Sequence, residues 1–408
     1  MNNTVPAVGN DDRCGDAADV CLAMSPYLSV EKIDESAATI CLQSTGARLR
    51  IPRALYALLL LFQQPMSLAA LAASDARAER AKSALENLLA KGFLVRADEP
   101  LAPVVRRLVT DPPVRLFDCP AHRLVPAEAD VVIFGVPSDV ADRAAAGTRN
   151  GPAALREISL QVLYMLDKLS GRPQGWFDAD RECPVLAGVS FGDCGDIFVD
   201  YGEPQTSVFS KLSDALEKVL REHTLPVLLG GDASICIPAI ETLQARASLT
   251  VLRIGGAAQT NDANQRGFVA VSGLASRLTS MPGVNGYVQA GTASAGHAPG
   301  RHAITTSAVK QSGFAALQPF LSRGQDVYLG LDIGIVSPPG KHDDSSEGLS
   351  YTETQALLCA IGDHCHIIGI DLVGLNPGKP CWGSTAMTAL HLLLTAISAV
   401  KDINEHAA

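Results

Sequence analysis

The feature that most constrains the fold is a series of short apolar runs that alternate with helical segments after residue 129. The runs are DVVIFGV, PVLLGG, TVLRIGG, YVQAG, VYLGLDI and HIIGIDL. Unbroken apolar runs of this length are typical of strands covered on both faces, as in a parallel sheet between helices. We therefore expect residues 129–408 to form one α/β domain, a three-layer α/β/α sandwich around a mainly parallel sheet.

The preceding segment follows another rhythm. Strand-like YLSVEKI, ATICLQS and RLRIP come first, and the helical segments RALYALLLLF, SLAALAAS and ARAERAKSALENLLAKGF follow, before a last strand, FLVRAD. Ser67 is placed to cap the second helix and Gly92 to end the third, in which Leu85 and Leu88 share a face. This order predicts a small winged-helix α+β domain over residues 26–98.

The segments that flank this domain have loop-like composition. Residues 1–25 are polar and rich in Gly and Asp, which predicts a flexible tail. Residues 99–128 are rich in proline, which predicts an extended linker to the domain at 129–408.

Charge and cysteine usage limit the possible surroundings and partners. The net charge of −10 is carried by residues after 110, because the first 110 hold equal numbers of basic and acidic side chains. An acidic main domain is a poor partner for nucleic acid. The ten cysteines form no CxxC pair, the chain opens without a signal-peptide pattern, and ALYALLLLF is too short for a membrane span. We expect a cytoplasmic protein with no membrane partner.

The predicted winged-helix segment resembles the PqqD-like domain, the leader-peptide recognition element of ribosomal-peptide modification enzymes. The run SLAALAA…ALENLLAKGFLVR carries the resemblance. In that family a leader peptide adds as a strand beside the third strand and rests on the third helix, so backbone hydrogen bonds give the affinity. The matching positions are Arg48, Leu49, Arg50 and Ile51 on the strand, and Lys82, Glu86 and Leu89 on the helix. A docking or dimerisation domain and a DNA-binding winged helix are the alternatives, although the third helix mixes both signs of charge.

The second domain resembles the ureohydrolases, the family of arginase and agmatinase. Segments in the family's order carry this resemblance: FGVPSDVADRAAAGTRNGPAALRE, FGDCGDIFV, LLGGDASICIPAI, YVQAG, VYLGLDIGIVSP, EGLSYTE and IIGIDLVGLNP. The resemblance implies the arginase fold. In active members it also implies a manganese pair held by carboxylate and imidazole side chains, which activates a bridging hydroxide.

The ligand positions of that metal pair have changed in this sequence. The resemblance assigns them to Ala233, Gly255, Ala257, Gln259, Asp332 and Gly334. Of these only Asp332 keeps a ligand side chain. Gly374 stands where the family has a guanidinium-facing Glu, and Ser272 where it has a catalytic-loop His. We therefore interpret the domain as a pseudo-ureohydrolase that holds no metal or other cofactor.

The changes have a physical rationale, and the emptied site could take another ligand. Clustered acids and imidazoles without metal would repel one another and suffer desolvation, so small neutral residues relieve the strain. Framing residues such as Gly230, Gly231, Asp232, Ser234, Gly291 and Asp371 persist, and we expect them to serve turns and hydrogen bonds. The candidate polar contacts of a new ligand are Asp232, Gln259 and Asp332.

Other reactive clusters favour structural roles. We expect His364 and His366 to be polar residues at the start of a strand, and His297 and His302 to lie in a solvated loop, in preference to metal-ligand pairs. A charged loop is the expectation for His342, Asp343 and Asp344. Cys236 is expected to be an inert buried thiol, and acids on both sides of Cys194 should raise its pKa.

The leading functional hypothesis is a non-catalytic partner protein in ribosomal-peptide modification. Its first domain would bind the precursor's leader peptide, and its second would scaffold a modifying enzyme or its own homo-oligomer. One alternative is a remodelled enzyme that acts on a peptide without metal. The other is a winged-helix DNA-binding regulator whose second domain senses a ligand.

Overall fold

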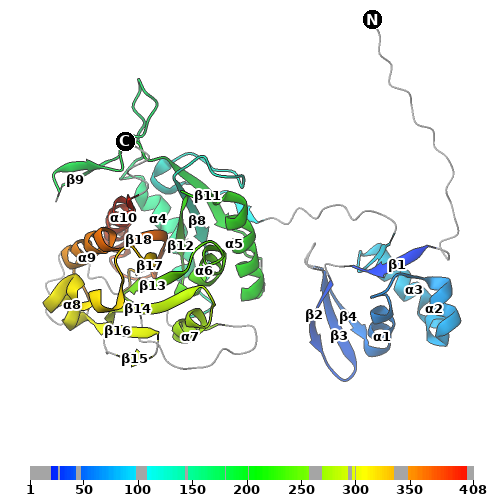
Figure 1. Ribbon diagram of the computed structural model, residues 1–408. Coiled ribbons are helices and arrows are strands. Elements are labelled where there is room, and N and C mark those ends of the chain that lie inside the picture. The colour runs from blue at the N-terminus through cyan, green and yellow to red at the C-terminus, as the bar shows by residue number, and fades with distance from the viewer. Residues whose placement is uncertain are drawn as a thin grey trace, which may run out of the picture. The chain divides into compact units, whose positions relative to one another are not determined.

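The computed structural model describes residues 20–25, 28–42, 47–97, 108–142, 146–179, 181–200, 202–256, 269–292, 296–298, 300–334 and 348–401. The chain forms two compact units, residues Met1–Arg106 and Arg107–Ala408 (Figure 1). Each unit has its own hydrophobic core.

The first unit contains the expected order of strands and helices. Its elements are β1 (Cys21–Met24), β2 (Leu28–Ile33), β3 (Ala37–Leu42), β4 (Ala47–Pro52), α1 (Arg53–Leu61), β5 (Met66–Ser67), α2 (Leu68–Ser74), α3 (Ala76–Ala90) and β6 (Leu94–Arg96). β2, β3 and β4 form an antiparallel sheet in that order, and β1 lies between β5 and β6 in a second sheet.

Local signals in the sequence set the helix boundaries of this unit. The Ser67 hydroxyl accepts a hydrogen bond from Ala70 N at 3.1 Å and caps α2. After α3 the chain turns at Gly92, whose φ of +79° favours glycine. Leu85 and Leu88 of α3 are 1% exposed and pack in the core. The cap, the turn and the apolar face agree with the prediction.

The expected tail at 1–25 is shorter than predicted. Residues Cys21–Met24 form β1, which pairs with β5 and β6, and Leu22 is buried in the core of the first unit. A short strand with a single buried leucine gives too weak a period-two pattern to recognise within a polar segment.

In the described part of the second unit, ten strands form one sheet. Their order across it is β15 (Gly296–Ala298), β16 (Arg301–Thr305), β14 (Val284–Thr292), β13 (Leu249–Ile254), β17 (Asp326–Asp332), β18 (His366–Val373), β12 (Leu225–Gly230), β8 (Val131–Val136), β11 (Phe191–Ile197) and β7 (Val109–Thr110). Neighbours pair in parallel except at the two edges, where β15 and β7 are antiparallel. A mainly parallel sheet was the expectation.

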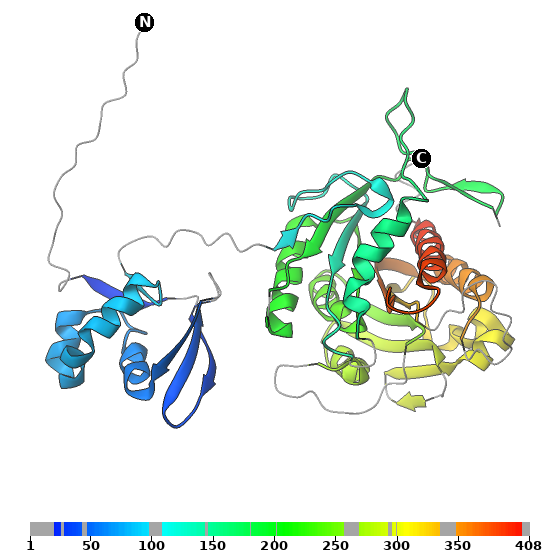
Figure 2. The same ribbon diagram turned by 180° about the vertical axis from the view of Figure 1, so that it is seen from behind.

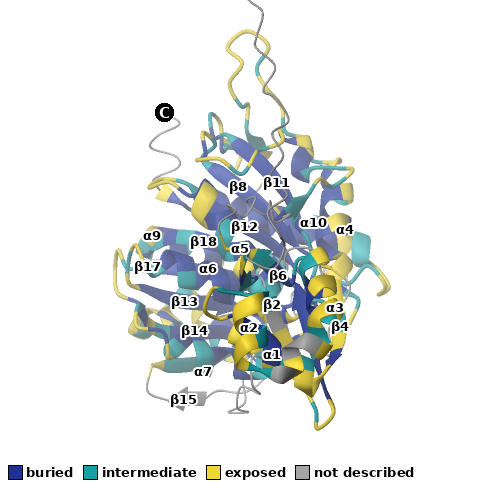
Figure 3. Ribbon diagram, turned by 90° about the vertical axis from the view of Figure 1, so that its right-hand side faces the viewer, coloured by how far each residue is buried: buried dark blue, intermediate teal, exposed yellow. Residues whose placement is uncertain are grey.

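Helices cover both faces of this sheet, as Figures 1 and 2 show. The helices of the unit are α4 (Gly151–Ser159), α5 (Gln205–Val219), α6 (Cys236–Leu243), α7 (Leu274–Thr279), α8 (Thr306–Ser312), α9 (Tyr351–His364) and α10 (Trp382–Ser398). One core cluster joins the sheet to α4, α9 and α10, and the other joins it to α5, α6 and α7. β8, β12 and β13 are buried along their whole length (Figure 3). The three-layer α/β/α sandwich is thus confirmed.

The predicted linker at 99–128 ends earlier than expected, because the chain joins the second unit from Leu108. β7 pairs with β11, and Leu116 and Phe117 are fully buried. Leu116 N also donates to Asp193 Oδ2 at 2.9 Å. Prolines at 112, 113 and 120 therefore lie in an irregular segment after β7 that packs on the domain. Residues 98–107 lie outside the described part of the chain.

A buried ion cluster explains two segments that carry the family resemblance. Arg156 of GPAALRE is fully buried, and its Nε donates to Asp193 Oδ2 at 2.8 Å. A second nitrogen, Nη1, donates to Asp196. Asp193 and Asp196 come from FGDCGD on β11, so these segments tie α4 to the sheet.

Among the described residues, none of the helices has both the length and the apolar character that spanning a membrane requires.

Candidate functional site

The assigned ligand positions gather at the carboxyl ends of adjacent strands, where open α/β sheets place their sites. β13, β17, β18 and β12 are neighbours in the sheet, and Gly255, Asp332, Gly374 and Ala233 stand at or just after their ends. Gly374 N donates to Gly231 O at 3.0 Å, which joins the ends of β18 and β12. Ala257 and Gln259 lie outside the described residues.

Asp332 occupies the middle of this edge and is surrounded by glycines. A Cβ built on Gly374 would lie 2.3 Å from its Oδ1, and one on Gly334 would lie 3.1 Å from the same oxygen. A Cβ on Gly256 would lie 3.5 Å from its Oδ2. The carboxylate therefore fills space that a side chain at 374 would need and crowds one at 334, whereas a Cβ at 256 would be in ordinary contact with it.

The backbone beside Asp332 adopts conformations that suit glycine. The φ angles are +83° at Gly255, +90° at Gly256 and +86° at Gly374. Other L residues are strained there. A Glu at 374, as the family resemblance would require, would be strained and would overlap the Asp332 carboxylate, whereas an Asp at 255 would be strained by its φ angle alone.

The donors at the site do not fit a metal pair. Ala233, Gly255 and Gly334 have no ligand atom in their side chains, and within the described ranges no three His, Cys, Asp or Glu side chains cluster as a metal site would need. A single carboxylate cannot hold two hard cations. No step through manganese can be derived for these residues.

Asp332 itself is a perturbed acid. Gly334 N donates to its Oδ1 at 3.0 Å, and the side chain is partly exposed at the strand end. Desolvation by the surrounding protein raises the pKa of this carboxyl, although the nearby positive charge of Arg253 acts to lower it.

A buried arginine lies beneath the same strand ends. Arg253 on β13, Gly330 on β17 and Asp371 on β18 are register partners across three strands. The Arg253 Nη1 donates to Asp371 Oδ2 at 3.0 Å, and both side chains are at most 2% exposed. A Cβ on Gly330 would lie 2.3 Å from that Nη1, so only glycine leaves room for the arginine to cross.

Asp232 and its neighbours serve the fold, as expected of the framing residues. Both Asp232 oxygens accept backbone hydrogen bonds, Oδ1 from Ser234 N at 2.9 Å and Oδ2 from Ala141 N at 3.0 Å. Burial raises the pKa of this carboxyl. A Cβ on Gly231 would lie 2.2 Å from Ser138 O. Asp232 therefore holds the turn after β12, and a role for it as a ligand contact stays a prediction.

His364, His366 and His302 each contact a different residue of the second unit. His364 Nε2 lies 3.0 Å from Leu321 O, whereas His366 Nδ1 lies 2.7 Å from Asp326 Oδ1. His302 stacks on Phe320 with ring centroids 4.3 Å apart. His342, Asp343 and Asp344 lie outside the described residues, and the side chain of His297 is not described.

Cys194 and Cys236 are both buried, as expected for Cys236. Burial is the main cause that raises the pKa of each thiol. The charge of Asp193 adds to the effect at Cys194, where neighbouring acids were the expected cause. Neither thiol is poised as a nucleophile.

The strand predicted to bind peptide lies at the edge of its sheet. β4 pairs with β3 on one side, and the order β2-β3-β4 leaves its other side without a strand among the described residues. Arg48 and Arg50 are exposed, Leu49 is half-buried and Ile51 is buried. An exposed edge of this kind can pair with an added strand.

The residues of β4 that bond to β3 can be identified from the hydrogen bond just after the end of β4, where Arg53 N donates to Ser36 O at 3.0 Å. In an antiparallel pair of strands, opposite residues are alternately hydrogen-bonded and not hydrogen-bonded to each other. The odd-numbered residues of β4 therefore bond to β3. Arg48 and Arg50 direct their N–H and C=O groups to the outer edge, and Pro52 directs only a carbonyl there.

The helix positions predicted to support the peptide are only partly brought to this strand. On α3, Lys82 and Glu86 are exposed, while Leu89 is half-buried. Leu89 and Leu49 of β4 pack against the same core cluster. However, α1 is the helix that packs directly against β3 and β4.

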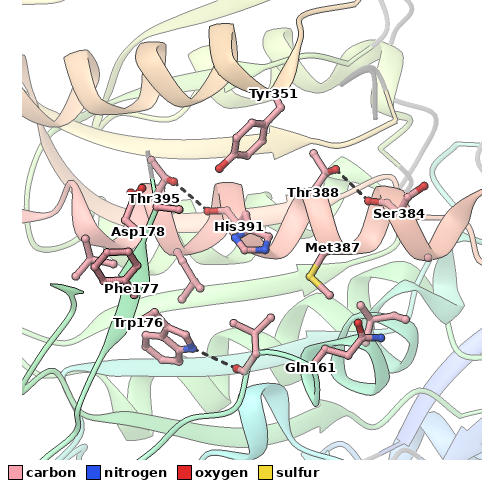
Figure 4. Close-up of a pocket in the computed structure, with 16 residues that line it drawn as sticks. Gln161, Trp176, Phe177, Asp178, Tyr351, Ser384, Met387, Thr388, His391 and Thr395 are labelled. Atoms are coloured by element: carbon pink, nitrogen blue, oxygen red, sulfur yellow. Dashed lines mark hydrogen bonds between the residues drawn. The ribbon is translucent and has the colours of Figure 1, made fainter. Parts of the chain in front are cut away.

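A groove of about 730 Å³ lies along α10 (Figure 4). It is lined by Trp176 and Phe177 of β9 (Trp176–Asp178) and by Met387 of α10. Its other labelled side chains are Gln161, Asp178, Tyr351, Ser384, Thr388, His391 and Thr395. Thr388 and Thr395 donate to carbonyls of their own helix, so the groove offers mainly apolar contacts.

Sequence reasoning missed Arg253, Arg156 and the groove. An arginine inside an apolar strand run, TVLRIGG, is an available signal, because a buried charge needs a partner. The groove residues of α10 recur at helical spacing in STAMTALHLLLT, but the long run of apolar residues obscures the pattern.

The family model described as Arginase family matches residues 129–398. The agmatinase of Proteus mirabilis is 34% identical over 115 residues, which are 28% of this chain and 34% of that protein. The chain thus spans about a third of the length of the first curated relatives. The agmatinase of Blochmanniella floridana is 27% identical over 289 residues, covering 64% of this chain and 86% of that protein.

Solved structures show the same fold. The proclavaminate amidino hydrolase of Streptomyces clavuligerus has a TM-score of 0.56 at 21% identity, over 72% of this chain and 98% of that one. The formiminoglutamase of Trypanosoma cruzi, solved with Mn²⁺, has a TM-score of 0.52 at 19% identity, over 72% of this chain and all of that one. With the family match spanning most of the second unit, the chain belongs to the arginase family.

Proposed function

We propose that this chain is a non-catalytic member of the arginase family that binds the leader segment of a ribosomally made precursor peptide. The first unit, a PqqD-like domain in this proposal, binds the peptide. The second unit, a pseudo-ureohydrolase, scaffolds the modifying enzyme or a homo-oligomer of the chain.

The observation that carries the non-catalytic part is the surroundings of Asp332. Ligand side chains are lacking at Ala233, Gly255 and Gly334, and the backbone at Gly255 and Gly374 has a conformation that favours glycine. Returning a Glu to 374 would overlap the Asp332 carboxylate, and an Asp at 255 would be strained by the backbone. The names of the curated relatives indicate agmatine hydrolysis in those proteins, but that chemistry needs ligands that these positions lack.

The peptide-binding part is supported by the edge of β4. It presents outward backbone groups from Arg48 and Arg50 beside an apolar surface that includes Leu49. Strand addition to such an edge supplies affinity through main-chain hydrogen bonds, whatever the peptide's sequence.

The test is purification of the intact chain from its native cells, with mass spectrometry of retained peptides. Arg50→Pro removes an outward N–H without removing a bond to β3, and Arg50→Lys is the matched control that keeps the N–H and the charge. We expect one short precursor peptide on the wild type and on Arg50→Lys, and its loss from Arg50→Pro. Retention of no peptide, or equal retention by all three, would overturn the proposal.

Asp332 favours a second candidate, a remodelled enzyme. Its pKa is raised, and carboxyls with raised pKa values at strand ends are common general acids or bases. Turnover of an arginine-containing peptide without added metal, abolished by Asp332→Ala, would support this function over the first.

A further inference from the structure

We propose that the second unit binds a second copy of this chain by placing an apolar hairpin, residues 163–174, in the groove along α10 of that copy. The inference deepens the scaffold part of the proposed function and rests on it, because it names the surface through which copies of the chain would meet. Three observations carry it: an ordered hairpin with exposed apolar side chains, an apolar groove, and a helix without charges along that groove.

Exposed apolar side chains concentrate at this hairpin, which projects from the body of the second unit (Figures 1 and 2). Leu169 is 99% exposed at its tip, and Met165 and Leu166 are also exposed. Phe177, which follows on β9 and lines the groove, is 71% exposed. Single exposed apolar residues are ordinary on a soluble protein, whereas several in one short segment are typical of an interaction surface.

Hydrogen bonds hold the hairpin in one conformation. Asp167 Oδ1 accepts from Leu169 N at 3.0 Å and from Ser170 N at 2.7 Å. Between the two arms, Gln174 N donates to Met165 O at 2.8 Å. The backbone that presents Leu169 is therefore ordered before any partner binds, which reduces the entropy lost when the leucine is buried.

The base of the hairpin is joined to the groove. Trp176 Nε1 donates to Val162 O at 3.2 Å, and the Tyr164 and Trp176 ring centroids lie 6.1 Å apart. Trp176 and Val162 both line the groove. Because hairpin and groove adjoin, two copies related by a twofold axis can each place the hairpin in the groove of the other.

The groove is apolar and close to neutral. The 17 residues of α10, WGSTAMTALHLLLTAIS, include no Asp, Glu, Lys or Arg, although Ser384, Met387 and His391 line the groove. Among the described residues that line it, Asp178 alone is charged, and Arg181 Nε lies 3.7 Å from its Oδ2. A helix face left in water usually carries charged residues, whereas the core of a protein interface is depleted of them.

The charge of the chain favours a second copy as the occupant. At a net charge of −10 two copies repel one another, so their association is least opposed where the surface is neutral. The groove meets this condition. The hairpin carries Lys168 and Arg172 against Asp167 and is slightly basic, which lowers the repulsion from an acidic neighbour.

The first experiment is sedimentation velocity of the intact chain from nanomolar to micromolar concentration. We expect the wild type to form a reversible oligomer with an even number of copies. Leu169→Glu in the hairpin and Met387→Lys in the groove should each reduce that number to half, by weakening the contact roughly thirtyfold or more. Circular dichroism would verify that Met387→Lys is folded, because Met387 is half-buried.

Val125→Glu is the matched control for the hairpin variant. Val125 is an exposed apolar residue two positions before Ala127, which packs in the core cluster on the α5 side of the sheet. The variant adds the same charge as Leu169→Glu and should keep the oligomeric state of the wild type.

Mixing the two interface variants tests the contact itself. When a Leu169→Glu copy meets a Met387→Lys copy, the new glutamate faces the new lysine at one contact. The other contact keeps Leu169 against Met387. The full oligomer should therefore return on mixing, although each variant alone stays at half its size.

The outcomes separate this inference from the proposed function. A wild type that is monomeric at micromolar concentration, a Leu169→Glu variant of unchanged size, or mixing without recovery would each overturn the inference. Loss of a co-purified enzyme from Leu169→Glu when the wild type is monomeric would assign the groove to a different protein and also overturn it. Retention of the precursor peptide by Leu169→Glu would keep peptide binding in every case, whereas a wild type that associates as expected but retains no peptide would overturn the proposed function alone.

Discussion

Arg253 crosses the neighbouring strand β17 to reach Asp371 on β18, with 3.0 Å between its Nη1 and the Asp371 Oδ2. Both side chains are buried. The pair places a fixed positive charge beneath the strand ends, and that charge also acts on Asp332. The Arg253 guanidinium is therefore a positive charge within the protein that acts on both Asp371 and Asp332.

Replacing Arg253 with Met should lower the free energy of unfolding by about 3–5 kcal/mol, because Asp371 would remain buried without its partner. The further change Asp371→Leu should recover much of this loss. Urea denaturation of the wild type, both single variants and the double variant measures the coupling. Additive effects of the two changes would contradict the account of the pair.

The space beside Gly374 is the basis of a second prediction. Gly374→Ala meets a positive φ and also the Asp332 carboxylate, whereas Gly324→Ala meets a φ of +71° with no other atom within 4 Å. We expect a loss of about 1–2 kcal/mol at Gly324 from backbone strain alone. The loss at Gly374 should be larger by about 1–3 kcal/mol, because the new methyl group overlaps the carboxylate.

A second substitution, at Asp332, distinguishes the overlap with its carboxylate from the backbone strain of the positive φ. Adding Asp332→Ala should recover the excess loss at Gly374 and leave the loss at Gly324 unaltered. Thermal unfolding of the four variants would test this, and equal losses at the two glycines would show that Asp332 does not fill the space.

Much of the fold was predictable because its signals are local and repeated. The apolar runs at DVVIFGV and HIIGIDL lie in β8 and β18, and Ser67 and Gly92 mark the predicted boundaries. Each signal depends only on residues near it in the chain. Local propensity and strand periodicity are therefore sufficient to identify these elements.

The remaining features depend on contacts between distant residues. Nothing near Arg253 in the sequence indicates that Asp371 lies two strands away in the sheet. The prolines of 108–128 are typical of a linker, although this segment packs on the second unit through Leu116 and Phe117. The glycine-favouring backbone at Gly255 and Gly374 was likewise not predictable, because composition alone gives no dihedral angles.

The pKa of Asp332 predicts how stability depends on pH. Because burial raises this pKa in the folded chain, the folded state binds a proton more tightly than the unfolded state does. Stability from this group therefore falls as pH rises from the ordinary aspartate pKa through the raised one. Asp332→Asn should be more stable than the wild type at pH 7, with a difference that shrinks as pH is lowered.

Urea denaturation of both proteins between pH 8 and pH 4.5 measures that difference. Asn can keep the hydrogen bond from Gly334 N through its amide oxygen, so the comparison isolates the charge. A variant less stable than the wild type at pH 7, with a gap that closes on acidification, would show that the ionised carboxylate is favoured in the folded chain.

We expect that this member of the arginase family does not hydrolyse guanidines with a manganese pair, because Ala233, Gly255 and Gly334 have no ligand side chains. The direct measurement incubates the intact chain with Mn²⁺, removes weakly bound ions by desalting, and determines retained manganese by mass spectrometry. Urea release from agmatine and from an arginine-containing peptide is followed on the same sample. We expect substoichiometric manganese and no urea above the buffer, whereas a stoichiometric metal pair accompanied by urea release would show that the site is a working manganese centre.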